Sequence, residues 1–215
     1  KWLESTDYDS LCECRITPAL LNQTLSSLET IPCALYLTSP DYLGNILDIK
    51  AIAKICHQYH MILLVDNAHG AYLKFIDKPY IHPIDAGADL VSDSAHKTLP
   101  ALTGAAYLHI SQHAPQTLLK LSSNIRDYSV MFGSTSPSYL ILESMDHVNK
   151  WLIDHPDAYK HFVYKVSKLK QDIKALGFHL RESEPLKIVL SVPHQGQSLM
   201  TDLTSHHIEC EYADP

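Results

Sequence analysis

The sequence predicts an α/β fold, a mainly parallel sheet flanked by helices, followed by part of a smaller α+β domain. Three observations predict it. Short apolar runs typical of buried strands alternate with segments of helical periodicity through the first 110 residues. Strand, helix and strand in succession nearly always cross over right-handed into a parallel sheet. After residue 152 the pattern changes to a polar helix and two short strands, so we divide the chain into domains at residues 1–152 and 153–215.

The first half of the chain supplies the units of this sheet in order. Thr17 followed by Pro18 is typical of a helix start, with an N-cap and a proline in the first helical turn, and that helix should end near residue 29. Residues 33–38 form a compact strand candidate. Asp48 should cap a second helix, whose apolar residues recur every 3.6 positions through about residue 59. The apolar run at 61–65 is the next strand.

The remaining elements are shorter or more polar. A short helical turn is expected at residues 84–87, between the second and third strands. The other predicted segments are strands at 89–92 and 104–110, helices at 115–123, 137–151 and 157–176, and strands at 178–180 and 187–192. The last helix and the last two strands would begin the smaller domain.

Composition narrows the function classes. A net charge of −7 and a sequence pI near 6.0 give no basic field for nucleic acid or for an anionic membrane surface. No apolar run approaches the ~18 residues of a membrane span, and the chain does not start with a secretory signal, so we expect a cytoplasmic protein. The five cysteines and fourteen histidines lack the spacing of a redox motif or a zinc site, which predicts free thiols and no metal.

Two polar phrases follow two of the predicted strands. Asp66 begins the phrase Asp-Asn-Ala-His-Gly after the strand at 61–65, and Lys97 ends the phrase Ser-Ala-His-Lys after the strand at 89–92. Open α/β sheets bind ligands at the carboxyl ends of their strands. A lysine amine forms Schiff bases with carbonyl compounds, and the ring nitrogen of pyridoxal phosphate (PLP) commonly pairs with an aspartate. Asp66 and Lys97 fit these two roles.

Four landmarks carry a family resemblance. They are residues 37–44 (Leu-Thr-Ser-Pro-Asp-Tyr-Leu-Gly), 66–71 (Asp-Asn-Ala-His-Gly-Ala), 94–103 (Ser-Ala-His-Lys-Thr-Leu-Pro-Ala-Leu-Thr) and 134–140 (Ser-Thr-Ser-Pro-Ser-Tyr-Leu). In this order they resemble the ornithine/lysine/arginine decarboxylases, which are fold type I PLP enzymes. The resemblance implies decarboxylation of a basic amino acid, a small-molecule substrate, and a homodimer or higher homo-oligomer. It also implies that an upstream part of the large domain, with the loop that holds the cofactor phosphate, is missing.

The same resemblance implies a role for each matching residue. Lys97 would form the Schiff base, Asp66 would pair with the pyridinium nitrogen, and His69 would border the active site. The cofactor contacts would be completed by Ala68 against the ring face, Ser94 and His96 at the phosphate, and Ser134 and Thr135 at the phosphate of a neighbouring subunit. A helix N-cap at Ser136, before Pro137, explains the 134–136 phrase equally well.

The sequence departs from the family pattern at two positions. Gly104 stands where glutamine is usual, and Asn67 stands where an acidic residue is common. Two alternatives stay open. Another fold type I enzyme, such as an α-oxoamine synthase, has a similar Asp-x-Ala-His-Gly phrase, although a glycine-rich run typically follows its lysine and here Thr98-Leu99-Pro100 follows. A catalytically silent or incomplete relative is the other alternative.

Overall fold

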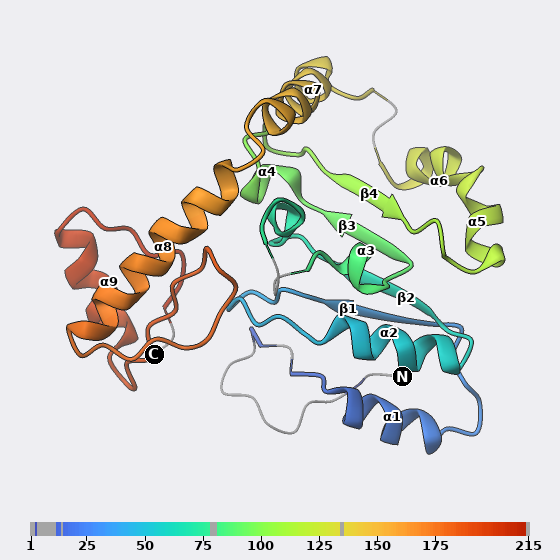
Figure 1. The fold of residues 1–215 in the computed structure, drawn as a ribbon, viewed down its shortest axis with the longest axis horizontal. Coiled ribbons are helices and arrows are strands. Elements are labelled where there is room, and N and C mark those ends of the chain that lie inside the picture. Colours follow the sequence, from blue (N-terminus) through green and yellow to red (C-terminus); the bar gives the residue numbers. More distant parts are fainter. Residues whose placement is uncertain (1–2, 4–11, 14, 78–80, 134–135, 214–215) are drawn as a thin grey trace.

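The computed structural model describes residues 3, 12–13, 15–77, 81–133 and 136–213 and has a four-stranded sheet at its centre (Figure 1). The strands are β1 (Ala34–Thr38), β2 (Ile62–Asp66), β3 (Leu90–Asp93) and β4 (Tyr107–Ile110), in the spatial order β1-β2-β3-β4. The pairs β1–β2 and β2–β3 are parallel, whereas β4 runs antiparallel to β3. The predicted α/β fold with a mainly parallel sheet is confirmed.

One side of the sheet is covered by α1 (Pro18–Ser26) and α2 (Ile49–Gln58). Both helices begin where the sequence predicts. Thr17 Oγ1 accepts a hydrogen bond from the Leu20 N–H (3.1 Å), and Asp48 Oδ1 accepts one from the Ala51 N–H (3.0 Å). Their apolar faces and the strands share a core formed by Leu21, Leu25, Leu37, Ile49, Ile52, Ala53, Cys56, Met61, Leu63, Val65, Ala88 and Val91.

A second core lies beyond the carboxyl ends of the strands. It joins η1 (Ala71–Phe75), α4 (Ala95–Thr98), α7 (Tyr139–Asp154) and α8 (Ala158–Ala175) through buried side chains that include Tyr72, Val148 and Tyr159. The Tyr159 hydroxyl donates to the Thr98 carbonyl (2.6 Å), so α8 supports the short helix that carries Lys97. The other helices here are α3 (Pro83–Ala86), α5 (Gln116–Ser122) and α6 (Ile125–Phe132).

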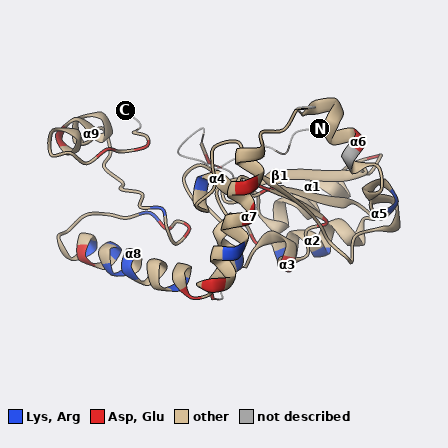
Figure 2. Cartoon of the chain, turned by 90° about the horizontal axis from the view of Figure 1, so that it is seen from above, with Lys and Arg blue, Asp and Glu red and all other residues tan. Residues whose placement is uncertain are grey.

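The C-terminal part differs from the sequence prediction. Figure 2 shows α8 and α9 (Gly196–Ser205) extending to one side of the sheet. The strands expected at 178–180 and 187–192 do not form, and these segments share only an isolated antiparallel bridge between Leu180 and Leu190. Two short strands with no third neighbour are marginal in water, which explains the difference. None of the described helices is both long and apolar enough to cross a bilayer.

Candidate functional site

The loops that follow the three parallel strands meet at one edge of the sheet. Thr38 pairs with Asp66, and Asp66 pairs with Ser92, so the strand ends lie level with one another. The Asn67 N–H donates to the Ser92 carbonyl (2.8 Å), and the Ser39 N–H donates to the Asp66 carbonyl (3.0 Å). The two phrases singled out in the sequence therefore lie side by side at the edge where α/β proteins bind ligands.

Lys97 and His69 are brought into contact. Lys97 Nζ lies 3.2 Å from His69 Nε2, and Lys97 is exposed to the solvent. Burial lowers the pKa of His69, and the positive charges of Lys97 and Lys187 lower it further against the opposing effects of Glu211 and Asp66. His69 is thus a neutral ring that accepts a hydrogen bond from the lysine amine.

Asp66 presents a fixed carboxylate. Its Oδ1 accepts a hydrogen bond from the Ala68 N–H (3.0 Å), and its Oδ2 accepts one from the Tyr36 hydroxyl (3.2 Å). Burial, followed by the charge and hydrogen bond of Asp66, raises the pKa of Tyr36. The sequence analysis missed Tyr36, although the period-two alternation of strand residues places it on the same face as Thr38.

The structure describes only some of the residues that are expected to contact the phosphate. Ser94 is the N-cap residue of α4 and its side chain makes no capping hydrogen bond. His96 donates from Nδ1 to the Ala105 carbonyl (3.1 Å), so its Nε2 can donate to a phosphate only when the ring is cationic. Ser134 and Thr135 lie outside the described residues, and their predicted role stays a prediction.

A cavity of about 1000 Å³ opens beside Lys97 and His69. Its far wall comes from the C-terminal part of the chain. Lys187 Nζ donates to the Tyr42 carbonyl (2.9 Å) and lies 3.2 Å from Glu211 Oε2. The cavity is lined by Tyr42, His69, Lys97, Thr98, Leu99, Pro100, Trp151, Ala158, Tyr159, Phe162, Glu184, Leu186, Lys187 and Glu211. The sequence analysis missed Lys187 and Glu211, because no local pattern links them to Lys97.

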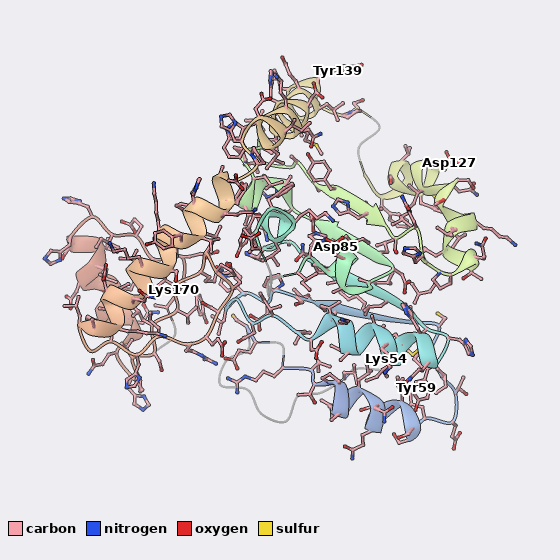
Figure 3. All side chains as sticks on the ribbon, in the orientation of Figure 1. Lys54, Tyr59, Asp85, Asp127, Tyr139 and Lys170 are labelled. Carbon is pink, nitrogen blue, oxygen red and sulfur yellow. The ribbon has the colours of Figure 1, made fainter. Side chains whose placement is uncertain are left out.

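Glu184 attaches this wall to the rest of the protein. Only 3% of Glu184 is exposed, and its carboxylate accepts hydrogen bonds from the Tyr72 hydroxyl and from the Leu186 N–H (2.8 Å). Its own N–H donates to the Gly44 carbonyl (2.6 Å). Gly44 has φ +86°, and a Cβ there would lie 3.1 Å from Glu184 Cγ, so the contact requires glycine. Lys170, labelled on α8 in Figure 3, donates to the Glu184 carbonyl (3.0 Å).

A buried polar network lies among the strand ends. Asp93 Oδ1 accepts from Asn67 Nδ2 (2.6 Å), and Asp93 Oδ2 accepts from His82 Nε2 (2.9 Å) and His109 Nε2 (2.8 Å). Burial alone would raise the pKa of Asp93. The hydrogen bonds from the two histidines and Asn67, with the charge of His82, outweigh burial and lower this pKa well below its ordinary value.

His82, Asp93 and His109 also have the donor atoms of a metal site, within 4.8 Å of one another. The sequence analysis did not foresee this cluster. Their hydrogen bonds indicate that the histidines hold the Asp93 carboxylate and do not bind a metal. The Ile84 N–H donates to His82 Nδ1 (3.2 Å), which places the proton of the neutral ring on Nε2, the atom that faces Asp93. His82 therefore donates to the carboxylate and has no lone pair on that nitrogen for a metal.

The residues present at the sheet edge fit PLP. They comprise an exposed lysine amine for the aldehyde, an oriented carboxylate for the ring nitrogen, and a serine hydroxyl free of capping for the phosphate. Ala68 has only a methyl side chain and lies beside Asp66, and its predicted position against the ring stays a prediction.

Comparison with known proteins agrees with this chemistry. The chain is 32% identical over 203 residues to the uncharacterized protein YaaO of Bacillus subtilis, covering 87% of this chain and 41% of that protein. It is 28% identical over 188 residues to the arginine decarboxylase of the same organism, covering 81% of this chain and 36% of that one. The chain thus spans less than half the length of these relatives.

A solved structure shares the fold. Serine palmitoyltransferase from S. paucimobilis, bound to a PLP–myriocin aldimine, superposes with a TM-score of 0.68 at 16% identity, covering 91% of this chain and 51% of that one. At this identity the likeness shows the fold alone. Residues 14–200 match the family described as Orn/Lys/Arg decarboxylase, major domain. Because this match covers most of the sequence, the chain belongs to the Orn/Lys/Arg decarboxylase family, whose fold is that of fold type I PLP enzymes.

Proposed function

We propose that the protein decarboxylates a basic amino acid, arginine, lysine or ornithine, with Lys97 as the residue that binds PLP covalently. Bound PLP supplies the electron sink for the carbon that loses CO2. The chain supplies the positioning. Asp66, held by the Ala68 N–H and the Tyr36 hydroxyl, keeps a proton on the ring nitrogen. His69 accepts a hydrogen bond from the Lys97 amine and thereby orients it.

The position of Glu211 in the cavity is the observation that supports a basic substrate. Of the described residues that line the cavity, two are acidic, and Glu184 is buried and already accepts two hydrogen bonds. The Glu211 side chain is 58% exposed and has Lys187 as its ion-pair partner. A carboxylate in this position offers a charge-assisted hydrogen bond to an ammonium or guanidinium group at the far end of a substrate.

Exposed apolar side chains support the proposal of a second subunit. Large apolar side chains on either side of residues 134–135 are exposed, Phe132 by 90% and Tyr139 by 85%. Met131 and Leu140 beside them are exposed by 72% and 67%. Apolar surface of this kind commonly marks a protein interface, which supports a homodimer in which Ser134 and Thr135 reach the partner's cofactor.

The first test is covalent attachment of PLP. In the PLP-loaded protein, borohydride reduction and peptide mapping should place the cofactor on Lys97, and Lys97→Ala should lose both bound-PLP absorbance and CO2 release. Lys74→Ala is the matched control, since Lys74 pairs with Asp85 on the surface. If Lys97→Ala kept its absorbance and its CO2 release, the assignment would be wrong. PLP bound to Lys97 without CO2 release from any of the three amino acids would instead indicate another PLP reaction.

The second test concerns substrate charge. We expect Glu211→Gln to lower kcat/KM for the cationic substrate about 10- to 100-fold, the loss typical of one charged hydrogen bond. Turnover of a neutral analogue, citrulline for arginine or norleucine for lysine, should change little. Glu209→Gln removes an equal charge two positions away and should leave both substrates unaffected. Equal losses on charged and neutral substrates would contradict the assignment of Glu211.

A further inference from the structure

A buried side-chain pair joins the loop after β2 to the end of strand β3. Asn67 follows Asp66 directly, and Asp93 lies four positions before Lys97. Asn67 Nδ2 donates to Asp93 Oδ1 at 2.6 Å. Asn67 is fully buried and Asp93 is 4% exposed, so water does not compete for this hydrogen bond.

We propose that the Asn67–Asp93 pair is a positioning device that fixes Asp66 relative to Lys97. The proposal rests on the proposed function, in which Asp66 and Lys97 hold opposite ends of the PLP ring system. Neither Asn67 nor Asp93 touches the cofactor in this scheme. They act through the segments that carry Asp66 and Lys97.

Asp93 is held from its other side as well. His82 and His109 both donate to Asp93 Oδ2, at 2.9 and 2.8 Å. His82 is 2% exposed, and the Ile84 N–H fixes its proton on the nitrogen that faces Asp93. The carboxylate therefore cannot rotate away from Asn67 without leaving the buried donors of Asn67 and His82 unpaired, which is unfavourable.

Asn67 is fixed in one orientation too. Its Oδ1 is buried without a hydrogen-bond partner in the described part of the chain, while its Nδ2 faces the carboxylate. Turning the amide over would set two acceptors against each other at Asp93. The pair thus has a defined polarity, with the acid at the end of strand β3 and the amide on the loop after β2, although the resembling family commonly has an acid at position 67.

This polarity makes the pair testable by exchange. Asn67→Asp places a second carboxylate against Asp93. In the double variant Asn67→Asp/Asp93→Asn, an amide at 93 can accept from both histidines through its oxygen and donate to the new acid through its nitrogen. The exchange restores the hydrogen bond with its direction reversed.

The experiment compares PLP binding in the wild type, Asn67→Asp and the double variant. We expect Asn67→Asp to weaken PLP binding about 10-fold or more, as for a lost charged hydrogen bond, and to shift the pH midpoint of bound-PLP absorbance. The double variant should recover most of the PLP affinity and most of the pH midpoint. Asn45→Asp is the matched control, because Asn45 Nδ2 donates to Asp41 Oδ2 (2.7 Å) in a pair outside these two loops. It should lower stability without moving the pH midpoint.

Hydrogen exchange in the cofactor-free protein separates this proposal from the proposed function. Amides of residues 67–70 and 94–97 should exchange faster in Asn67→Asp and recover in the double variant, whether or not PLP binds. If exchange changed uniformly through the chain, or if the double variant failed to recover either loop, the pair would have only a general stabilising role and the proposal would be overturned. Absence of PLP binding in the wild type would contradict the proposed function alone.

Discussion

Two sides of the candidate site are built in opposite ways. Behind the strand ends, Asp93 is 4% exposed and accepts hydrogen bonds from three side chains. Across the cavity, Glu211 is 58% exposed and Lys187 is 15% exposed, and these two are joined by one ion pair of 3.2 Å. In the first arrangement the carboxylate is buried among its partners, whereas in the second the Glu211 carboxylate is open to solvent and only Lys187 is shielded.

This difference matches two different requirements. The proposed covalent chemistry needs its groups held within a fraction of an ångström, and a buried carboxylate that accepts three side-chain hydrogen bonds provides that rigidity. Recognition of a flexible, charged substrate end needs a carboxylate that can exchange one cation for another. Because Glu211 is solvent-exposed, its ion pair contributes little to stability, and exchanging the cation costs little. Changes in the first region should therefore affect folding, and changes in the second should affect charge and selectivity.

The largest expected effect is that of Gly70→Ala. A Cβ at Gly70 would overlap Asn67 Oδ1 and lie 2.8 Å from Pro40 Cδ. Because Asn67 is held by Asp93, it cannot move without breaking a buried hydrogen bond. We expect the free energy of unfolding to fall by about 3 kcal/mol, measured by urea denaturation.

Gly177→Ala provides the comparison for that substitution. Gly177 has φ +92° and nothing within 4 Å of its Cβ position, so only backbone strain acts there, at about 1 kcal/mol. Similar losses for the two variants would show that the strand-end network is more compliant than its geometry indicates.

We expect Asp93→Asn to have a smaller effect and to lower the free energy of unfolding by about 2 kcal/mol at neutral pH, the value of a charged hydrogen bond. The pKa of Asp93 is lowered from its ordinary value of 3.8, so the folded state favours the carboxylate. Its contribution to stability is complete well above pH 3.8 and is lost as the pH falls below that value. Denaturation of wild type and variant from pH 7 to pH 3 should show the two curves converging in acid; a constant gap would contradict this origin.

The fold was predictable where local rules decide it. Apolar runs mark β1, β2 and β3, and the caps at Thr17 and Asp48 mark two helix starts, because each signal lies within a few residues of the element it specifies. Pairing of the 178–180 and 187–192 segments depends on neighbouring strands that local sequence does not describe. The sequence analysis missed helix α6 because this helix begins without a side-chain cap that would mark its start.

The candidate site divides in the same way. Asp66, His69 and Lys97 follow predicted strands, and a parallel sheet brings such residues to one edge. Asp93 directly precedes the phrase that ends at Lys97, but its importance depends on His82 and His109, which meet it only in the folded chain. Glu211 depends on the docking of a distant segment through Glu184. Sequence analysis therefore found the residues proposed to contact PLP and missed those that support them.

The smallest effect concerns the open wall, and it is the most direct test of the contrast between the two regions. Burial and the charges of Lys97 and Lys187 lower the pKa of His69 below its ordinary value of 6.5, whereas Glu211 raises it. In the cofactor-free protein, Lys187→Met should raise the NMR titration midpoint of His69, and Glu211→Gln should lower it. Added salt should weaken both shifts, because charges in an open, solvated cavity are screened by mobile ions. Shifts that ignored salt would mean that this wall closes over His69 and is as dry as the network around Asp93. Shifts of the same sign in both variants would contradict the opposite effects of the two charges on His69.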